Sequence, residues 1–330
     1  MKVSEYHRNF FSENSKSESS WRVVSLVLFV ITSAILILYW DPLGLQKYIE
    51  PLFYFQAERP LVEYLFRAIT FIGDDEFFML FLSVLIWSVH KSLGYWTAVA
   101  LLLAGAYTFQ LKEMFAVPRP DLGIQQPGND AFPSGHTLST FVFWGYMATR
   151  IKTTRFWIWT VSIVVLMGLS RMILGYHFVR DILGGLTLGF VFLVVFILIS
   201  ALVIERGWVE KFKFPALLVI SIIAPILLTV LLSDDVGRLM GYLAGISVGY
   251  VLEKEKIGYL TKGLWHQHAL RILLGWGVMF AIVLGLSGVL TSEVLAFAFI
   301  RYALAGFWVT FVAPLIFTRI GLAECEGESS

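Results

Sequence analysis

The sequence predicts an all-α protein that crosses a membrane several times, and two observations support this prediction. Hydrophobic residues make up 58% of the 330-residue chain and charged residues only 15%, whereas about a quarter of the residues of soluble domains are charged. The apolar residues also gather in runs of about twenty, the length that a helix needs to cross a hydrocarbon layer roughly 30 Å thick. Backbone groups inside that layer must bond within their own segment, so we expect each run to be a helix.

About ten apolar runs are long enough to be spans. In chain order they cover 22–40, 74–90, 94–111, 136–150, 156–171, 181–203, 215–233, 236–252, 269–288 and 294–317. The stretch 41–73 between the first two runs contains Pro42, Pro51 and Pro60 and is interrupted by charged residues. We therefore expect this stretch to lie in the membrane interface rather than to cross the bilayer.

The positions of lysine and arginine predict the orientation of the chain. Most of these residues fall in alternate connections, namely Lys2, Arg8, Lys16 and Arg22; Lys91; Arg150, Lys152 and Arg155; Arg206, Lys211 and Lys213; Lys254, Lys256 and Lys262; and Arg319. Cytoplasmic connections are enriched in such residues, so the pattern predicts a multi-pass cell-membrane protein with both termini in the cytoplasm. Lys112, Arg119, Arg171 and Arg180 fall on the opposite side, and their position needs a functional explanation.

Net charge and cysteine content exclude other classes of partner. A net charge of +1 gives no reason to expect nucleic-acid binding. Cys325 is the single cysteine of the chain, so no internal disulfide can form. No group of carboxylates or histidines has the spacing of a metal site, and we expect neither a metal nor another cofactor.

Three polar segments lie at the outer ends of predicted spans. Residues 112–120 leave the third span, residues 133–136 enter the fourth, and residues 170–181 link the fifth to the sixth. Two short connections would bring all three segments together on one side of a helical bundle. The opposite-side cations belong to these segments, so we expect a site there that binds an anion.

The residue types in these segments suit a phosphate-like oxyanion. Lys112, Arg119 and Arg171 supply positive charge, and the two guanidinium groups match the geometry of phosphate oxygens. Ser134 and Gly135 lie at the start of a predicted helix, where free N–H groups and the helix dipole favour an anion. Although an isolated lysine at a helix end would be interpreted as a snorkelling cation, the two arginines at the same face favour the anion site.

Two histidines and an aspartate in these segments can perform covalent catalysis. His177 and Asp181 are four residues apart, one helical turn, so the carboxylate can hold one imidazole nitrogen and leave the other as a nucleophile. His136 follows the predicted anion-binding turn and is the candidate general acid for a leaving alkoxide. Asp181 could also serve as an N-cap of the sixth span.

The three segments together resemble the signature motifs of the type-2 phosphatidic acid phosphatase superfamily, the lipid phosphate phosphatases. These motifs are lysine, six residues and Arg-Pro; Pro-Ser-Gly-His; and Ser-Arg, five residues, histidine, three residues and aspartate, and their order and spacing match here. The resemblance covers roughly 60–205. It implies a six-helix core, a metal-independent phosphohistidine mechanism and the residue roles given above. We therefore expect an N-terminal segment 1–59, a phosphatase core 60–205 and a C-terminal extension 206–330 with about four further transmembrane helices.

The resemblance implies a lipid phosphate as substrate but leaves its identity open. Phosphatidic acid, phosphatidylglycerol phosphate, a polyprenyl diphosphate, and a sphingoid or lipid A phosphate all place a phosphate at the interface and a tail in the bilayer. A phosphotransferase would carry the same motifs. Vanadate-dependent halide oxidation uses a similar pocket but does not suit a chain with ten spans, and a transporter or scaffold would be favoured only if His177 or His136 were replaced.

Several charged residues outside the motifs have structural interpretations. The acidic residues Asp74, Asp75 and Glu76 precede the second span, where first-turn acids favour a helix N-terminus. Glu113 and Arg180 are expected to be interfacial charges without a catalytic role.

The C-terminal extension carries no catalytic motif. Gly241, Gly245 and Gly249 recur every four residues and predict a face for close helix packing, and a homodimer through these helices is one expectation. Arg238 and Arg301 lie near or within apolar runs and are candidates for a lipid path or for pairing with nearby acids.

Overall fold

The computed structural model describes residues 58–122, 130–205, 211–232 and 236–326. The predicted span 22–40 and most of the interfacial stretch 41–73 lie outside these residues. The described elements are α4 (Pro60–Phe71), α5 (Asp75–Val84), the π-helical segment η2 (Leu85–Val89), α6 (Lys91–Phe115), α7 (Gly135–Ile151), α8 (Thr154–Ile173), α9 (Val179–Glu205), α11 (Phe214–Leu231), α12 (Gly237–Lys256), α13 (Trp265–Gly285), α14 (Leu295–Phe307), the π-helical segment η4 (Trp308–Val312) and α15 (Ala313–Arg319). The described part of the chain contains no β-strand, only one isolated bridge. The all-α prediction is confirmed.

Each predicted span within the described residues coincides with a helix, but these helices differ in length and in apolar character. Six are long and apolar enough to cross a membrane: Lys91–Phe115, Thr154–Ile173, Val179–Val203, Phe214–Leu231, Trp265–Gly285 and Leu295–Arg319. The other three are α5 with η2, α7 and α12. Much of α7 and α12 is buried against neighbouring helices, so these helices need not present a continuous apolar surface to lipid.

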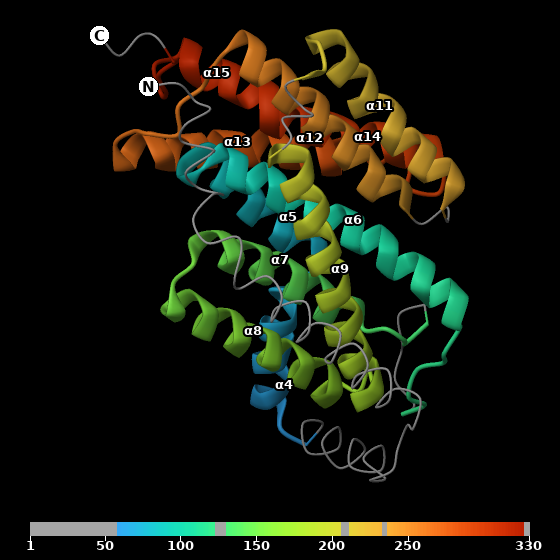
Figure 1. The fold of residues 1–330 in the computed structure, drawn as a ribbon. Helices are drawn as coiled ribbons and strands as arrows, with labels where there is room; N and C mark the ends of the chain where they lie inside the picture. Colours follow the sequence, from blue (N-terminus) through green and yellow to red (C-terminus); the bar gives the residue numbers. More distant parts are fainter. Residues whose placement is uncertain (1–57, 123–129, 206–210, 233–235, 327–330) are drawn as a thin grey trace.

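Helix α6 lies between two groups of helices. It contacts α7 on one side and α12 on the other, and α7 and α12 pack in turn against α8 and α14 (Figure 1). The short helix α4 packs against α8. Its 12 residues span about 18 Å, less than the thickness of a hydrocarbon core. The C-terminal helices therefore adjoin the part of the chain that carries the motifs.

The predicted glycine face of α12 packs against α14 within the same chain. A Cβ atom built on Gly241 would lie 2.2 Å from the carbonyl oxygen of Phe299, and one on Gly245 would lie 2.0 Å from that of Ala303. Only glycine allows the two backbones to approach this closely. The expectation of close helix packing is confirmed, and this face is occupied within the chain. A homodimer would have to use another surface and stays a prediction.

Substituting Gly245 with alanine is expected to lower the free energy of unfolding by about 1–3 kcal/mol, because a methyl group at this contact forces α12 and α14 apart. Gly277→Ala on α13 is the matched control, since no atom lies within 4 Å of a Cβ at that position. Thermal unfolding in detergent micelles measures both variants. Equal stability of the Gly245 variant and the wild type would contradict the packing described here.

Candidate active site

The three motif segments meet where α6 and α8 end and where α7 and α9 begin. Two backbone hydrogen bonds hold the connections together: the Ser134 N–H donates to the Asp181 carbonyl at 2.9 Å, and the Ala131 N–H donates to the Val117 carbonyl at 2.7 Å. A cavity of about 350 Å³ opens at this point, and six of the eight predicted site residues line it. These six are Lys112, Arg119, Gly135, His136, Arg171 and His177.

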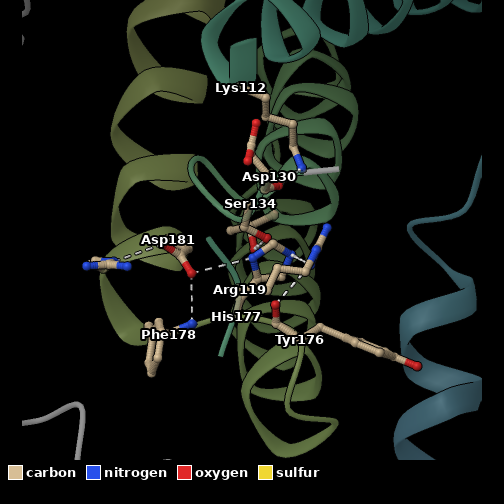
Figure 2. Close-up of polar contacts among 10 residues, drawn as sticks. Lys112, Arg119, Asp130, Ser134, Tyr176, His177, Phe178 and Asp181 are labelled. Carbon is tan, nitrogen blue, oxygen red and sulfur yellow. Dashed lines mark hydrogen bonds and ion pairs between the residues drawn. The ribbon is translucent and has the colours of Figure 1, made fainter. Parts of the chain in front are cut away.

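Three cations of the predicted site converge on this cavity. Lys112 is 7% exposed and Arg171 is 4% exposed. The Lys112 ammonium donates to the Asp130 carbonyl at 2.5 Å, and Arg119 Nη1 donates to the Tyr176 carbonyl at 2.9 Å (Figure 2). These two carbonyl groups orient the side chains of Lys112 and Arg119, and the gathering of three cations on one cavity can attract an anion.

Arg171 is held from two sides and keeps one donor without a partner. Its Nη1 donates to Thr70 Oγ1 at 2.7 Å, and its guanidinium lies over the Tyr176 ring at 4.5 Å from the centroid. Among the described residues, its Nε–H has no hydrogen-bond acceptor. Because an unpaired buried donor is unfavourable, this N–H is poised to bind an acceptor oxygen of a ligand.

The His177 imidazole is 1% exposed, and its two nitrogens have different neighbours. Nε2 lies 3.3 Å from Arg119 Nη1, and Nδ1 lies 3.6 Å from Asp181 Oδ2 (Figure 2). A guanidinium can only donate, so its position favours a lone pair on Nε2 and a proton on Nδ1, toward the carboxylate. The 3.6 Å separation exceeds a hydrogen bond, so Asp181 acts here through its charge.

Burial, followed by the nearby charges of Arg171 and Arg119, lowers the pKa of His177 well below its ordinary value of 6.5. Both effects disfavour the imidazolium form. The ring is therefore neutral at physiological pH, and Nε2 can act as a nucleophile.

Asp181 is fixed by the first turn of α9. It is the third residue of this helix, and its Oδ2 accepts a hydrogen bond from the Phe178 N–H at 2.8 Å. This is the reciprocal half of a capping box, not the N-cap position expected from the sequence. Arg180, expected to be only an interfacial charge, lies with Nε 3.4 Å from Asp181 Oδ1.

Ser134 and Gly135 occupy different environments. Ser134 is the N-cap residue of α7. It is fully buried, and its hydroxyl lies 3.0 Å from Thr137 Oγ1. Because its N–H bonds to Asp181, Ser134 joins α7 to α9 and does not line the cavity. Gly135 does line the cavity, so the N-terminus of α7 faces it with the first N–H groups of the helix.

A carboxylate that the sequence interpretation assigned to a helix start contacts the second histidine. Asp75 and Glu76 lie in the first turn of α5 as expected, but the Asp74 side chain makes no capping hydrogen bond. Instead, Asp74 Oδ1 lies 2.8 Å from His136 Nε2. The absence of a side chain at Gly73 leaves room for the His136 ring, because a Cβ atom at that position would lie only 3.0 Å from His136 Cδ2. The only sequence signal was the position of Asp74 at the outer end of a span.

The two intramembrane arginines of the C-terminal extension differ as well. Arg238 lines the cavity. Arg301 does not, and its Nη2 donates to the Ser292 hydroxyl. Of the nearby acids expected to pair with these arginines, Asp234, Asp235 and Glu293, the first two lie outside the described residues.

The arrangement combines a neutral imidazole, three cations and a helix N-terminus around one cavity. These groups suit a tetrahedral oxyanion that undergoes substitution at its central atom. Within the described ranges, no cluster of three or more His, Cys, Asp or Glu side chains could hold a metal ion.

Comparison with known proteins identifies two regions of the chain. A model described as the PAP2 superfamily matches residues 93–204, and a model described as the PAP2 superfamily phosphatase transmembrane extension matches residues 237–325. The first region contains all the predicted site residues, and the second contains α12 to α15.

Individual relatives match shorter parts of the chain. Phosphatidylglycerophosphatase B of Bacillus subtilis is 34% identical over 113 residues, which are 31% of this chain and 51% of that protein. Lipid A 4'-phosphatase of Porphyromonas gingivalis is 35% identical over 65 residues, 19% of this chain and 27% of that protein. The chain thus spans about half or less of the length of these relatives.

A solved structure has the same family description. The crystal structure of a transmembrane PAP2-type phosphatidylglycerolphosphate phosphatase from Bacillus subtilis is 24% identical, with a TM-score of 0.42, and covers 58% of this chain and 96% of that one. The matches of the two superfamily models confirm the resemblance that the motifs predict: the chain belongs to the PAP2 superfamily, and its C-terminal part is the transmembrane extension of that superfamily.

Proposed function

We propose that this protein hydrolyses phosphate monoesters of membrane lipids through a phosphohistidine formed on His177. The observation that carries the proposal is the position of a buried, neutral imidazole beside Lys112, Arg119 and Arg171 on one cavity. A phosphate monoester dianion is the ligand that three cations attract most strongly, and its phosphorus is an electrophile for the imidazole. The names of both curated relatives, a phosphatidylglycerophosphatase and a lipid A phosphatase, support a lipid as the alcohol.

In the first step, His177 Nε2 attacks phosphorus in line with the ester oxygen. The N–P bond forms while the P–O bond to the lipid breaks, and the three cations stabilise the charge on the remaining phosphoryl oxygens. Asp181 stabilises the positive charge that develops on the ring through its position 3.6 Å from Nδ1.

His136 supplies the proton that the leaving alkoxide needs. Its Nε2 is bound to Asp74 at 2.8 Å, so Nδ1 is the nitrogen that serves the leaving oxygen. Burial and then the charge of Arg171 lower the pKa of His136, and the Asp74 carboxylate opposes this shift and so helps the ring to hold its proton. After the transfer His136 is neutral, and the lipid leaves as its alcohol.

In the second step, water attacks the phosphorus of the phosphohistidine. His136 Nδ1 accepts a proton from that water, the N–P bond breaks, and inorganic phosphate leaves. Both histidines then return to their starting protonation states. The water that enters must approach from the side that the lipid alcohol has vacated.

The charge distribution supports a site on the non-cytoplasmic face. At the far end of α6 from Lys112, Lys91 Nζ lies 3.0 Å from Glu253 and 3.8 Å from Glu326. That end also carries Lys254 and Lys256 in the last turn of α12. Because lysine-rich ends face the cytoplasm, the motif end would face the periplasm, the exterior or a lumen.

The test is phosphate release from a panel of lipid phosphates by the full-length protein in detergent micelles with EDTA present. We expect the wild type to release phosphate at the same rate with and without the chelator. No release from any lipid phosphate would contradict the proposed function, and loss of release on chelation would contradict its metal-independent form.

A further inference from the structure

The cavity extends well beyond the phosphate-binding cations. Its remaining wall comes from α5, α6 and two helices of the C-terminal extension, α12 and α14. Apolar side chains, among them Met79, Leu82, Leu101 and Leu239, form part of this wall. A volume of about 350 Å³ is in the range of pockets that hold a small molecule, which is more than a phosphate group needs. The extension therefore takes part in enclosing whatever carries the phosphate.

Two polar side chains of α12 line this part of the cavity. Arg238 and Tyr242 are four residues apart and so lie on one face of the helix, and both belong to the cavity wall. Tyr242 is only 3% exposed, yet its hydroxyl has no hydrogen-bond partner in the part of the chain that the structure describes. Leaving a buried hydroxyl unpaired is unfavourable. A ligand group that forms a hydrogen bond with the Tyr242 hydroxyl would therefore gain binding free energy.

The charges near Arg238 restrict what this ligand group can be. Asp75 and Glu76, at the start of α5, line the same cavity and are exposed, as is Arg238. A second phosphate would be attracted by the guanidinium but repelled by both carboxylates. A hydrocarbon would leave the buried Tyr242 hydroxyl without a partner. An alcohol hydroxyl can donate to a carboxylate and accept from the guanidinium or from tyrosine, so it satisfies both kinds of group.

We infer that Arg238 and Tyr242 of the C-terminal extension, together with the carboxylates at the start of α5, bind a hydroxylated headgroup that carries the scissile phosphate. This inference rests on the proposed function. It restricts the substrate to lipids whose phosphate is attached to a polyol, such as glycerol or a sugar. It also gives α12 a role in selecting the substrate.

The test uses two substrates that differ by one hydroxyl. The first is phosphatidylglycerol phosphate, and the second is its analogue with propane-1,3-diol in place of the headgroup glycerol. We expect wild-type kcat/KM to be at least about tenfold higher for the first, since a site built to bind a hydroxyl discriminates against the analogue that lacks it. Phosphatidic acid, which has no headgroup alcohol, serves as a third substrate that reports phosphatase activity alone.

Tyr242→Phe removes only the hydroxyl, so the packing of the ring and the stability of the fold should be retained. We expect this variant to lower the ratio of kcat/KM between the paired substrates about tenfold. Tyr250→Phe is the matched control, because Tyr250 lies two turns further along α12, stacks on Tyr95 at 4.1 Å and does not line the cavity. It should keep the wild-type ratio.

The outcomes separate this inference from the proposed function. If the wild type releases phosphate but does not distinguish the paired substrates, or if Tyr242→Phe retains the wild-type ratio, the headgroup site is wrong and the phosphatase remains. If the wild type releases no phosphate from any of the three substrates, both the proposed function and the headgroup site that depends on it are wrong.

Discussion

Replacing His177 with alanine is expected to lower kcat/KM for lipid phosphate hydrolysis by about 10⁵-fold or more, the scale seen when a covalent nucleophile is removed. The cations that bind the phosphate remain in this variant, so KM should change much less than kcat. Phosphate release from micellar lipid phosphate, followed over hours, measures the loss. His266→Ala, which removes an exposed histidine at the start of α13, is the matched control and should retain wild-type activity.

The pH dependence of wild-type activity also tests the role of His177. His177 must be neutral to attack, so activity falls as the pH drops through its pKa. Because burial and then the neighbouring arginines lower the pKa of His177 below 6.5, the acid limb of kcat/KM should lie below pH 6.5. Substantial activity of the alanine variant would contradict the nucleophile assignment, whatever the shape of this profile.

Replacing His136 with alanine is expected to lower kcat by about 10²–10⁴-fold for a lipid phosphate, the contribution of a general acid. The loss should be much smaller for p-nitrophenyl phosphate, whose leaving group is stable without a proton. This comparison distinguishes a proton donor from a residue that merely shapes the pocket. Equal losses on both substrates would contradict the role of His136 as the acid in the first step.

Asp74→Asn should reproduce this pattern in weaker form. The asparagine keeps the size of the side chain but removes the charge 2.8 Å from His136 Nε2, so the protonated imidazole is less favoured. We expect kcat to fall about tenfold and the alkaline limb of the profile to move to lower pH. An unshifted alkaline limb would leave Asp74 with a structural role only.

The motifs made most of the site predictable because each places its residues at the end of a helix. Spacing within one segment is local, so the approach of His177 to Asp181 could be predicted, although His177 lies before the first residue of α9 and does not share a helical turn with Asp181. The convergence of the three cations follows from the position of each motif segment at the same end of neighbouring helices. Ser134 is the residue whose surroundings differ most from expectation, since its N–H serves the backbone of α9 rather than the cavity.

Contacts between distant segments could not be predicted in this way. Asp74 and His136 are 62 residues apart, and a carboxylate before a helix has an adequate local explanation in the helix dipole. The hydrophobic pattern likewise identified α7 and α12 as spans, although neighbouring helices cover both. The hydropathy of a residue indicates that its side chain avoids water. It does not show whether that side chain faces lipid or packs against another helix.

The contribution of the C-terminal extension to the cavity wall could not be predicted from the sequence either. Arg238 was one of two candidate arginines, and only the folded chain distinguishes it from Arg301 by placing it on the cavity. Tyr242 carried no signal, because a tyrosine in an apolar helix is ordinarily a packing residue. Its unpaired hydroxyl becomes visible only when the neighbours of the side chain are known.

The stereochemical course at phosphorus tests the central claim most directly. A lipid phosphorothioate monoester made chiral with oxygen isotopes would be hydrolysed by the wild type in isotopically labelled water. Attack by His177 followed by attack of water on the phosphohistidine comprises two in-line displacements, so the account predicts retention of configuration in the thiophosphate released. Inversion would mean that water attacks the lipid phosphate directly, and would contradict the phosphohistidine.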